Sequence, residues 1–231
     1  MRGKAWPRGP PAYAGWMPGQ PHPFDQSSYQ VRLEWGVEGL TRLAASDIVV
    51  VVDVLRFSST VIQALERGEG FALDGAARAV SINGAAVAEA AGASSALVML
   101  GGLRNAAAVA SAVLAVQEDR GARTSVGVLA CGELGGRSEG SPLRFAVEDL
   151  LGAGAIVSAL SDLGIDHSSP EAAAAGESFR ALRGAMRHLL AASGSGRELA
   201  AAGRTDEVSA AAAVDAASVV PVLRDGVFQA F

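Results

Sequence analysis

The sequence has little cysteine and little histidine. Cys131 is the one cysteine among 231 residues, so the chain cannot form an internal disulfide, which fits a reducing cytoplasm. Zinc sites use clusters of Cys and His, whereas His22, His167 and His188 are far apart in the sequence. We therefore expect a cytoplasmic protein without a zinc site.

Long hydrophobic runs and basic runs are also absent. The apolar run at 48–52 is far shorter than the roughly 20 residues that cross a bilayer. Arg and Lys form no run, and the net charge is −5. Neither a membrane nor a nucleic acid is an expected partner, and the sequence leaves a homo-oligomer open.

The composition is that of a globular protein, with 50% hydrophobic and 19% charged residues. Residues 1–25 differ from the rest because they are rich in Pro and Gly. We expect a disordered tail there, and the alternative is a docking arm that presents Trp6, Tyr13 and Trp16. Residues 26–231 are expected to form an α/β domain.

Hydrophobic patterns after residue 26 alternate between those of strands and those of helices. Strands are predicted at 29–35, 48–52, 96–100 and 125–130, with a weaker strand at 79–82. Helices are predicted over 59–67, 85–91, 105–118, 142–160, 170–192, 195–202 and 205–216. Residues 219–228 predict a closing β-hairpin, because Asp225-Gly226 is a strong turn pair.

This alternation predicts a three-layer α/β/α fold with a largely parallel sheet and a C-terminal β-hairpin. In such sheets, ligands bind beyond the carboxyl ends of the strands. Polar residues that directly follow a predicted strand are therefore the first candidates for a functional site.

Asp53 is the sharpest of these candidates, because it follows an apolar strand. A buried carboxylate without a partner there would be costly, so it needs a metal, a cation or several donors. Arg56 can bind an oxyanion with two donors, and Ser58, Ser59 and Thr60 open a predicted helix whose N–H groups favour anions. The segment is a candidate phosphate site; alternatively, Asp53 pairs with Arg56, and Ser58 or Ser59 is an ordinary helix cap.

Three other predicted strands are followed by candidates with two interpretations each. Asn83 and Gly84 either contact a ligand or form an ordinary turn. Asn105 either contacts substrate or caps a helix. Cys131 either lines the site or packs as a small apolar residue, and no histidine nearby in the sequence would activate it.

Glu148 and Asp149 lie in the middle of a predicted helix, among apolar residues. Neighbouring residues on a helix point about 100° apart. We therefore expect one of the two carboxylates to reach inward to a metal ion while the other faces solvent.

Several short segments, taken in order, follow the pattern of one protein family. They are Asp53–Thr60 (DVLRFSST), Ser81–Gly84 (SING), Leu103–Val109 (LRNAAAV), the set Cys131-Gly132, Glu148-Asp149 and Gly154-Ala155, and the ending Asp215–Gly226. Over residues 27–231, the chain resembles the 2-phosphosulfolactate phosphatase family.

The resemblance implies a phosphatase that depends on Mg²⁺. The family hydrolyses a small-molecule phosphoester, 2-phospho-3-sulfolactate, to 3-sulfolactate and phosphate in coenzyme M biosynthesis. By matched position, the metal ligands would be Asp53 and Glu148 or Asp149. The catalytic and substrate-binding residues would be Asp53, Arg56, Ser58, Ser59, Thr60, Asn83, Gly84, Asn105 and Cys131.

The chain departs from the family pattern in two places. Family members carry a long segment before Asn83, and here only residues 69–81 occupy that interval. Ala85 stands where the family has a hydroxyl residue. These departures motivate an alternative, a catalytically degenerate homologue that binds a small anion or a partner without turnover.

Overall fold

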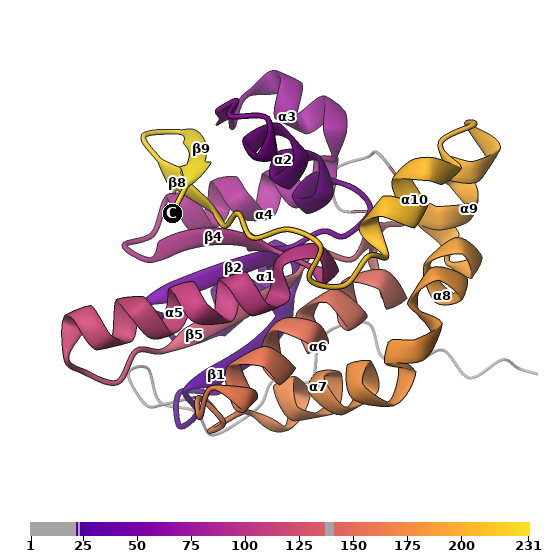
Figure 1. Ribbon diagram of the computed structural model, residues 1–231. Coiled ribbons are helices and arrows are strands. Elements are labelled where there is room, and N and C mark those ends of the chain that lie inside the picture. Colours follow the sequence, from indigo (N-terminus) through magenta and orange to yellow (C-terminus); the bar gives the residue numbers. More distant parts are fainter. Residues whose placement is uncertain (1–21, 23, 137–140) are drawn as a thin grey trace, which may run out of the picture.

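The computed structural model describes residues 22, 24–136 and 141–231 (Figure 1). The expected tail or docking arm, with Trp6, Tyr13 and Trp16, lies outside the described residues except for its last few positions. That expectation, and the division of the chain at residue 26, stay predictions.

A seven-stranded sheet forms the middle of the fold, in the order β1-β5-β2-β4-β8-β9-β3. The parallel strands are β1 (Val31–Trp35), β5 (Val126–Ala130), β2 (Ile48–Val52) and β4 (Leu97–Gly101). The antiparallel strands at one edge are β8 (Pro221–Arg224), β9 (Val227–Ala230) and β3 (Phe71–Ala72). The predicted α/β class and largely parallel sheet are confirmed.

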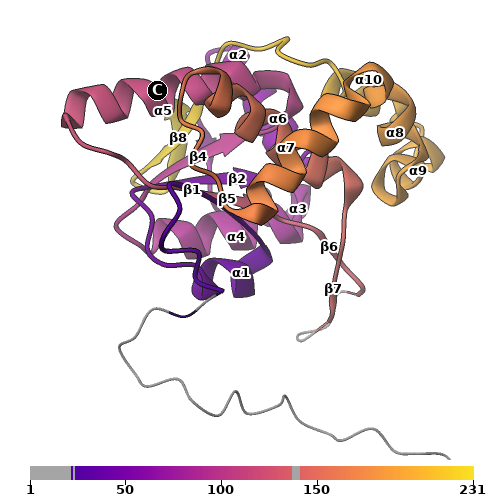
Figure 2. The same cartoon turned by 90° about the horizontal axis from the view of Figure 1, so that it is seen from below.

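Helices cover both faces of the sheet, which makes three layers (Figures 1 and 2). One face carries α1 (Gly36–Arg42), α2 (Phe57–Glu66), α3 (Gly75–Val80) and α4 (Ile82–Gly92). The other carries α5 (Ala106–Arg120), α6 (Val147–Asp162) and α7 (Pro170–Leu182). Strand β2 contacts both layers: Val50 packs with α5 and α6, and Val51 packs with α2 and α4. This two-sided burial explains the continuous apolar run of β2.

The predicted strand at 79–82 is wrong. These residues are the end of α3 and the start of α4, with Ser81 between the two helices. Asp74 caps α3 by accepting hydrogen bonds from the N–H groups of Ala76 and Ala77, and Ser81 caps α4 by accepting one from Gly84. Local capping therefore outweighs the weak strand pattern.

Two predicted helices have different bounds. Residues Leu143–Arg144 form β7, which pairs with β6 (Glu133–Leu134), so α6 begins only at Val147 rather than at Pro142. The predicted helix over 170–192 is divided into α7, a 3-10 turn at Arg183–Ala185 and α8 (Met186–Ala192). Gly184, with its low helix propensity, lies in that turn.

The C-terminal elements follow the predicted order. Helices α9 (Gly194–Ala201) and α10 (Thr205–Ala211) lie with α8 in one group beside α6 (Figure 1). The predicted hairpin is confirmed as β8 and β9. Its turn residues Asp225 and Gly226 have φ angles of 50° and 77°, as the tight turn of a two-residue hairpin requires.

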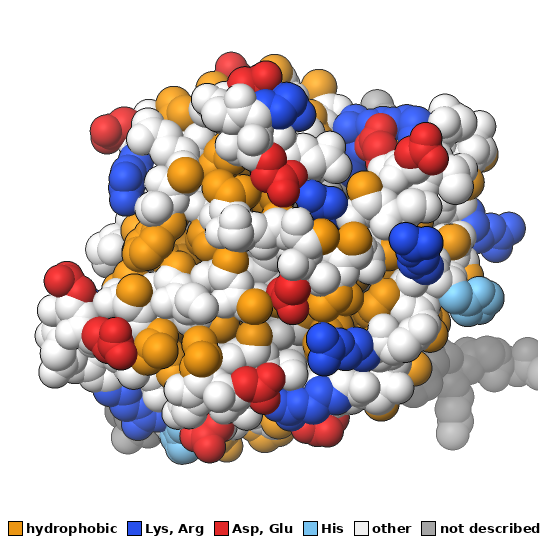
Figure 3. All heavy atoms as spheres, viewed as in Figure 1, with side chains coloured by type: hydrophobic (Ala, Val, Ile, Leu, Met, Phe, Trp, Pro, Cys, Tyr) orange, Lys and Arg blue, Asp and Glu red, His pale blue; other side chains and the backbone are white. Residues whose placement is uncertain are grey.

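The surface charge and the length of the helices are relevant to the nucleic-acid and membrane partners considered above. On the face shown in Figure 3, basic and acidic side chains of the described residues are interspersed, without a continuous basic patch. Among the helices that the structure describes, none combines the length and the apolar character that a bilayer crossing needs.

Candidate active site

A cavity of about 640 Å³ opens at the carboxyl ends of β2 and β5. The chain leaves β2 toward α2 on one face of the sheet and leaves β5 toward α6 on the other. Neighbouring strands whose connections diverge in this way leave a crevice between their ends. The acidic residues that line the cavity are Asp53, Glu133, Glu148, Asp149 and Glu198. Its arginines are Arg56, Arg78 and Arg204.

Asp53 lies at the bottom of this crevice, where β2 ends, and only 4% of it is exposed. Its Oδ1 accepts a hydrogen bond from the N–H of Phe57 at 3.2 Å, and its Oδ2 accepts one from the Ser81 hydroxyl. Burial raises the pKa of Asp53, the two hydrogen bonds oppose the rise, and nearby Glu133 adds to it. The alternative pairing of Asp53 with Arg56 is not formed: the two side chains make no ion pair within 4.0 Å, and Arg56 instead lies 3.9 Å from Glu207.

Asp149 joins the ends of the two central strands. Its Oδ1 accepts a hydrogen bond from the N–H of Val54 at 2.8 Å, and its Oδ2 accepts one from Gly132 at 2.9 Å. Burial raises the pKa of Asp149 well above its usual value, and the charges of Asp53 and Glu148 raise it further. The backbone N–H groups therefore hold a carboxylate whose charge is costly where it stands.

The expected placement of Glu148 and Asp149 is wrong in two respects. Both lie in the first turn of α6, because α6 begins at Val147 rather than several residues earlier. Both are also buried, at 3% exposed each, rather than one facing solvent. The first turn of a helix favours acidic side chains, since its N–H groups are free to face them.

Glu133 lines the same cavity. In the sequence, only its position shortly after the strand β5 pointed to this placement. Its Oε1 lies 3.4 Å from Asn83 Nδ2, which also donates to the Gly132 carbonyl at 2.9 Å. The Ser195 hydroxyl donates to Glu148 and lies 3.5 Å from Glu133 Oε2. Burial raises the pKa of Glu133, as do the charges of Glu198 and Glu148.

The four deepest carboxylates have no cationic partner. Among the described residues, no Arg, Lys or His lies within 4.0 Å of the carboxylates of Asp53, Glu133, Glu148 or Asp149. The same part of the chain contains no group of three or more His, Cys, Asp or Glu arranged to hold a metal ion. Four carboxylates thus share one cavity with three arginines and form no ion pair with any of them.

Comparison with sequence models of protein families gives a match. The sequence model of the 2-phosphosulpholactate phosphatase family matches residues 78–226. The chain belongs to this family. Membership supports a phosphatase function, and the matched region contains Asn83, Glu133, Glu148 and Asp149, whereas Asp53 precedes it. No curated protein matches the chain.

The predicted hydroxyl ligands in this family member bond to the backbone instead of lining the cavity. The Ser58 hydroxyl accepts a hydrogen bond from the N–H of Asp53 at 3.1 Å, and the Ser59 hydroxyl donates to the Val54 carbonyl at 2.9 Å. Thr60 does not line the cavity either. These side chains shape the turn that carries Asp53.

Gly84 packs closely against Asp53. A Cβ atom at Gly84 would lie 2.5 Å from Asp53 Oδ2 and 2.6 Å from Phe57 Cβ, so only glycine permits this close packing. The structure thus brings Gly84 to the site as a neighbour of Asp53, not as part of the cavity lining.

Asn105 and Cys131 lie away from the cavity lining. Asn105 is fully buried; its Oδ1 accepts from the Gly102 N–H, and its Nδ2 donates to the Leu100 and Val219 carbonyls. Burial raises the pKa of the Cys131 thiol well above its usual value, which disfavours the thiolate that a nucleophile needs.

Arg56 reaches the cavity together with a residue that the sequence did not indicate. Arg204, at the start of α10, donates from Nε and Nη2 to the two carboxylate oxygens of Glu207, at 2.6 and 2.7 Å. Arg56 Nη1 lies 3.9 Å from the same carboxylate. Burial lowers the pKa of Arg56, and the adjacent Arg204 charge lowers it further. No local pattern places α10 beside the end of β2.

Proposed function

We propose that the chain is a Mg²⁺-dependent phosphatase that hydrolyses a small anionic phosphoester. The substrate proposed first is 2-phospho-3-sulfolactate, which would give 3-sulfolactate and phosphate. The observation that carries the proposal is a cavity in a member of a phosphatase family where the acidic side chains of Asp53, Glu133, Glu148 and Asp149 form no ion pair with any described residue and Arg56 lines the same space.

The donor set fits a hard divalent cation. Mg²⁺ prefers oxygen ligands and commonly uses one or two carboxylates, with water and substrate phosphate completing its shell. This is consistent with the absence of a three-residue ligand group among the described residues. Asp53 and Asp149 would hold the ion, with Glu148 facing the same cavity. Bound Mg²⁺ would act as a Lewis acid that neutralises charge on the phosphate oxygens.

The residues around these carboxylates have positioning roles. Ser81 and Phe57 orient Asp53, and the N–H groups of Val54 and Gly132 orient Asp149. Arg56, which lines the same cavity, would bind a phosphate oxygen as a charge-assisted donor. Preorganised carboxylates and a cationic donor in one cavity are an arrangement that supports phosphoryl transfer.

Phosphate release by the purified full chain tests the proposal. The substrates are 2-phospho-3-sulfolactate and a panel of other phosphorylated hydroxy acids, each with Mg²⁺ or with a chelator. We expect Mg²⁺-dependent turnover that collapses in Asp53→Asn and is unchanged in Asp119→Asn, a solvent-exposed carboxylate near the end of α5. Turnover at background level over the whole panel would contradict the proposal.

The second candidate function is that of a degenerate homologue that binds an anion without turnover. It is favoured by the short interval between α2 and α4, which contains only β3 and α3. Calorimetry that shows tight binding of phosphate or 3-sulfolactate, with no hydrolysis in the same preparation, would support it. Multiple turnovers abolished by Asp53→Asn would exclude it.

A further inference from the structure

The rim of the cavity holds two arginines that share one carboxylate. Glu207 accepts two hydrogen bonds from Arg204, and its Oε2 lies 3.9 Å from Arg56 Nη1. Two guanidinium groups and one carboxylate leave one net positive charge. This cluster, Arg56, Arg204 and Glu207, lines or adjoins a cavity whose other charged residues are mostly acidic.

Most hydrogen-bond donors of the two arginines are uncommitted. A guanidinium group has five N–H donors, and the contact with Glu207 uses one on Nε and one on Nη2 of Arg204. The Arg56 side chain makes no hydrogen bond with any residue in the described part of the chain, although it is only 24% exposed. Both side chains line the cavity, so the remaining donors are available to a ligand there.

Contacts of Arg104 hold together the segments that carry this cluster. Arg104 donates from Nη1 to the Ala210 carbonyl of α10 at 3.1 Å, and its Nη2 forms an ion pair with Glu66 of α2 at 3.0 Å. Arg104 thus ties α10, which carries Glu207, to α2, which follows Arg56. A preorganised pair of cations binds an anion with little loss of side-chain freedom.

We propose that Arg204, held beside Arg56 by Glu207, forms a subsite for a second anionic group of the substrate. Arg56 contacts the phosphate, and Arg204 contacts a carboxylate or sulfonate on the same small molecule. Arg204 thereby selects phosphoesters with a second anion over esters of neutral alcohols. This inference rests on the proposed phosphatase function and adds the residue that determines specificity.

An ordinary surface ion pair is the competing explanation for Arg204 and Glu207. Arg180 and Glu177 form such a pair, with the same three-residue spacing and a 2.6 Å contact on α7. Neither of these two residues lines the cavity, whereas Arg204 does. Arg180→Gln is therefore a matched control for Arg204→Gln, because it removes the same kind of contact at a distance from the cavity.

The test compares three phosphate esters: 2-phospho-3-sulfolactate, 2-phospholactate and isopropyl phosphate, which has no second anion. We expect Arg204→Gln to raise KM for the first two about 10- to 100-fold, as for the loss of a hydrogen bond to a charged group. The kcat/KM for isopropyl phosphate should change less than about twofold, and Arg180→Gln should leave all three values unchanged. Arg204→Lys keeps the positive charge but lacks the paired N–H donors of a guanidinium group, so it should reverse only part of the increase in KM.

Calorimetry with 3-sulfolactate and with inorganic phosphate separates this inference from the proposed function. Binding of 3-sulfolactate that is weakened in Arg204→Gln, with phosphate binding unchanged, supports the subsite even if no ester is hydrolysed. Hydrolysis that falls equally for all three esters in Arg204→Gln overturns the subsite while the phosphatase proposal stands. If Arg204→Gln does not fold, as judged by circular dichroism, Arg204→Lys is measured against the same three esters and decides by the same criterion.

Discussion

Asp149 accepts a hydrogen bond from the backbone N–H of Val54, a residue 95 positions earlier in the chain. The other oxygen of the same carboxylate accepts one from Gly132. A single side chain at the start of α6 therefore holds together the segments that follow β2 and β5. Since Asp53 immediately precedes Val54, this contact also determines where Asp53 lies in the cavity.

Asp149→Ala is expected to lower the free energy of unfolding by about 2 kcal/mol or more. The substitution leaves two buried N–H groups without an acceptor, and each such group costs about 1–3 kcal/mol. Removal of a buried charge offsets part of this loss. Urea denaturation at pH 7 measures the difference, with Asp119→Ala as the exposed control. Equal stability of Asp149→Ala and the wild type would show that the two strand ends do not depend on this carboxylate.

Gly84→Ala is expected to lower stability by about 1–3 kcal/mol, as overpacking of a filled interior does. The added Cβ would meet Asp53 Oδ2 at 2.5 Å and Phe57 Cβ at 2.6 Å, so the Asp53 side chain must move. Activity should therefore fall together with stability. The measurement is thermal unfolding combined with phosphate release.

Gly75→Ala is the matched control for this substitution. Gly75 lies in the first turn of α3, and a Cβ there would meet no atom within 4 Å. Because alanine favours a helix more than glycine does, Gly75→Ala should be neutral or slightly stabilising. A Gly84→Ala protein with unchanged melting temperature and activity would contradict the packing that places Asp53.

Local sequence patterns were sufficient to predict the central strands and the position of Asp53 at the end of β2. The continuous β-branched run of β2 and the rule for parallel strand ends together predict that Asp53 follows a buried strand at the ligand-binding edge, and Asp53 lines the cavity there. The same rule pointed to the residues after β5, but Glu133 lines the cavity there and Cys131 does not. The rule predicts the position of a loop, whereas the orientation of each side chain depends on packing.

The rest of the site depends on contacts between distant segments. Ser58 and Ser59 have the residue types of anion ligands, but nearby backbone groups compete for their hydroxyls. Arg204 and Ser195 reach the cavity because α8, α9 and α10 fold back beside α6. The sequence near these two residues contains no motif, so only the tertiary structure reveals them.

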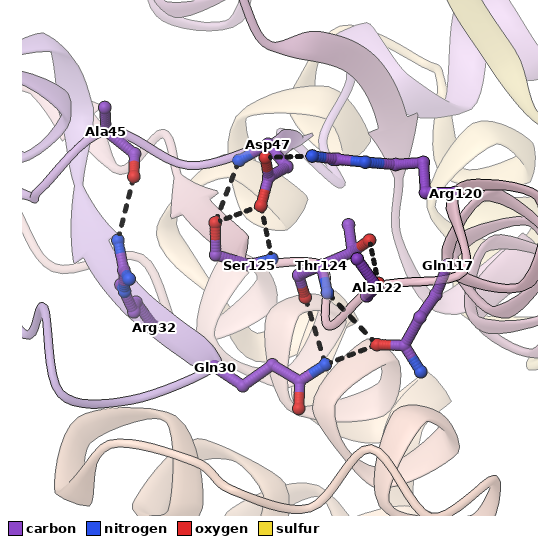
Figure 4. A network of polar contacts seen from close by, with 9 residues as sticks. All are labelled: Gln30, Arg32, Ala45, Asp47, Gln117, Arg120, Ala122, Thr124 and Ser125. Carbon is purple, nitrogen blue, oxygen red and sulfur yellow. Dashed lines mark hydrogen bonds and ion pairs between the residues drawn. The ribbon is translucent and has the colours of Figure 1, made fainter.

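Asp47, at the opposite end of the sheet, provides a prediction about pH (Figure 4). Its carboxylate accepts hydrogen bonds from the N–H and hydroxyl of Ser125 and from Arg120, each at 2.7 Å. Burial alone would raise the pKa of Asp47, but these hydrogen bonds outweigh it and lower the pKa to about 2.

The folded-state pKa of Asp47 is thus below its value in the unfolded chain, so the ionised carboxylate stabilises the fold. This contribution is fully present above about pH 4 and is lost as pH falls toward 2. Asp47→Asn should be less stable than the wild type by about 1 kcal/mol at pH 7, after allowance for solvent screening. Denaturation at pH 7 and at pH 3 measures the difference, which should shrink at the lower pH; a constant difference would contradict the assigned role.

Magnesium should stabilise the protein through the carboxylates of the cavity. A ligand that binds only the folded state adds about 1.4 kcal/mol at ten times its dissociation constant. We therefore expect 10 mM MgCl₂ to raise the melting temperature of the wild type if the dissociation constant is about 1 mM, whereas NaCl of equal ionic strength should not. Without Mg²⁺ at pH 7, Asp53→Asn should be at least as stable as the wild type, because it removes a buried charge whose pKa burial raises.

The same Asp53→Asn protein should gain little or nothing from Mg²⁺, since it lacks one of the proposed ligands. This pair of results distinguishes a carboxylate kept for metal binding from one kept for stability, because function commonly retains residues that destabilise the free protein. Asp119→Asn should respond to Mg²⁺ as the wild type does. An equal increase in the melting temperatures of Asp53→Asn and the wild type would mean that Mg²⁺ binds elsewhere, and the assignment of Asp53 as a metal ligand would be wrong.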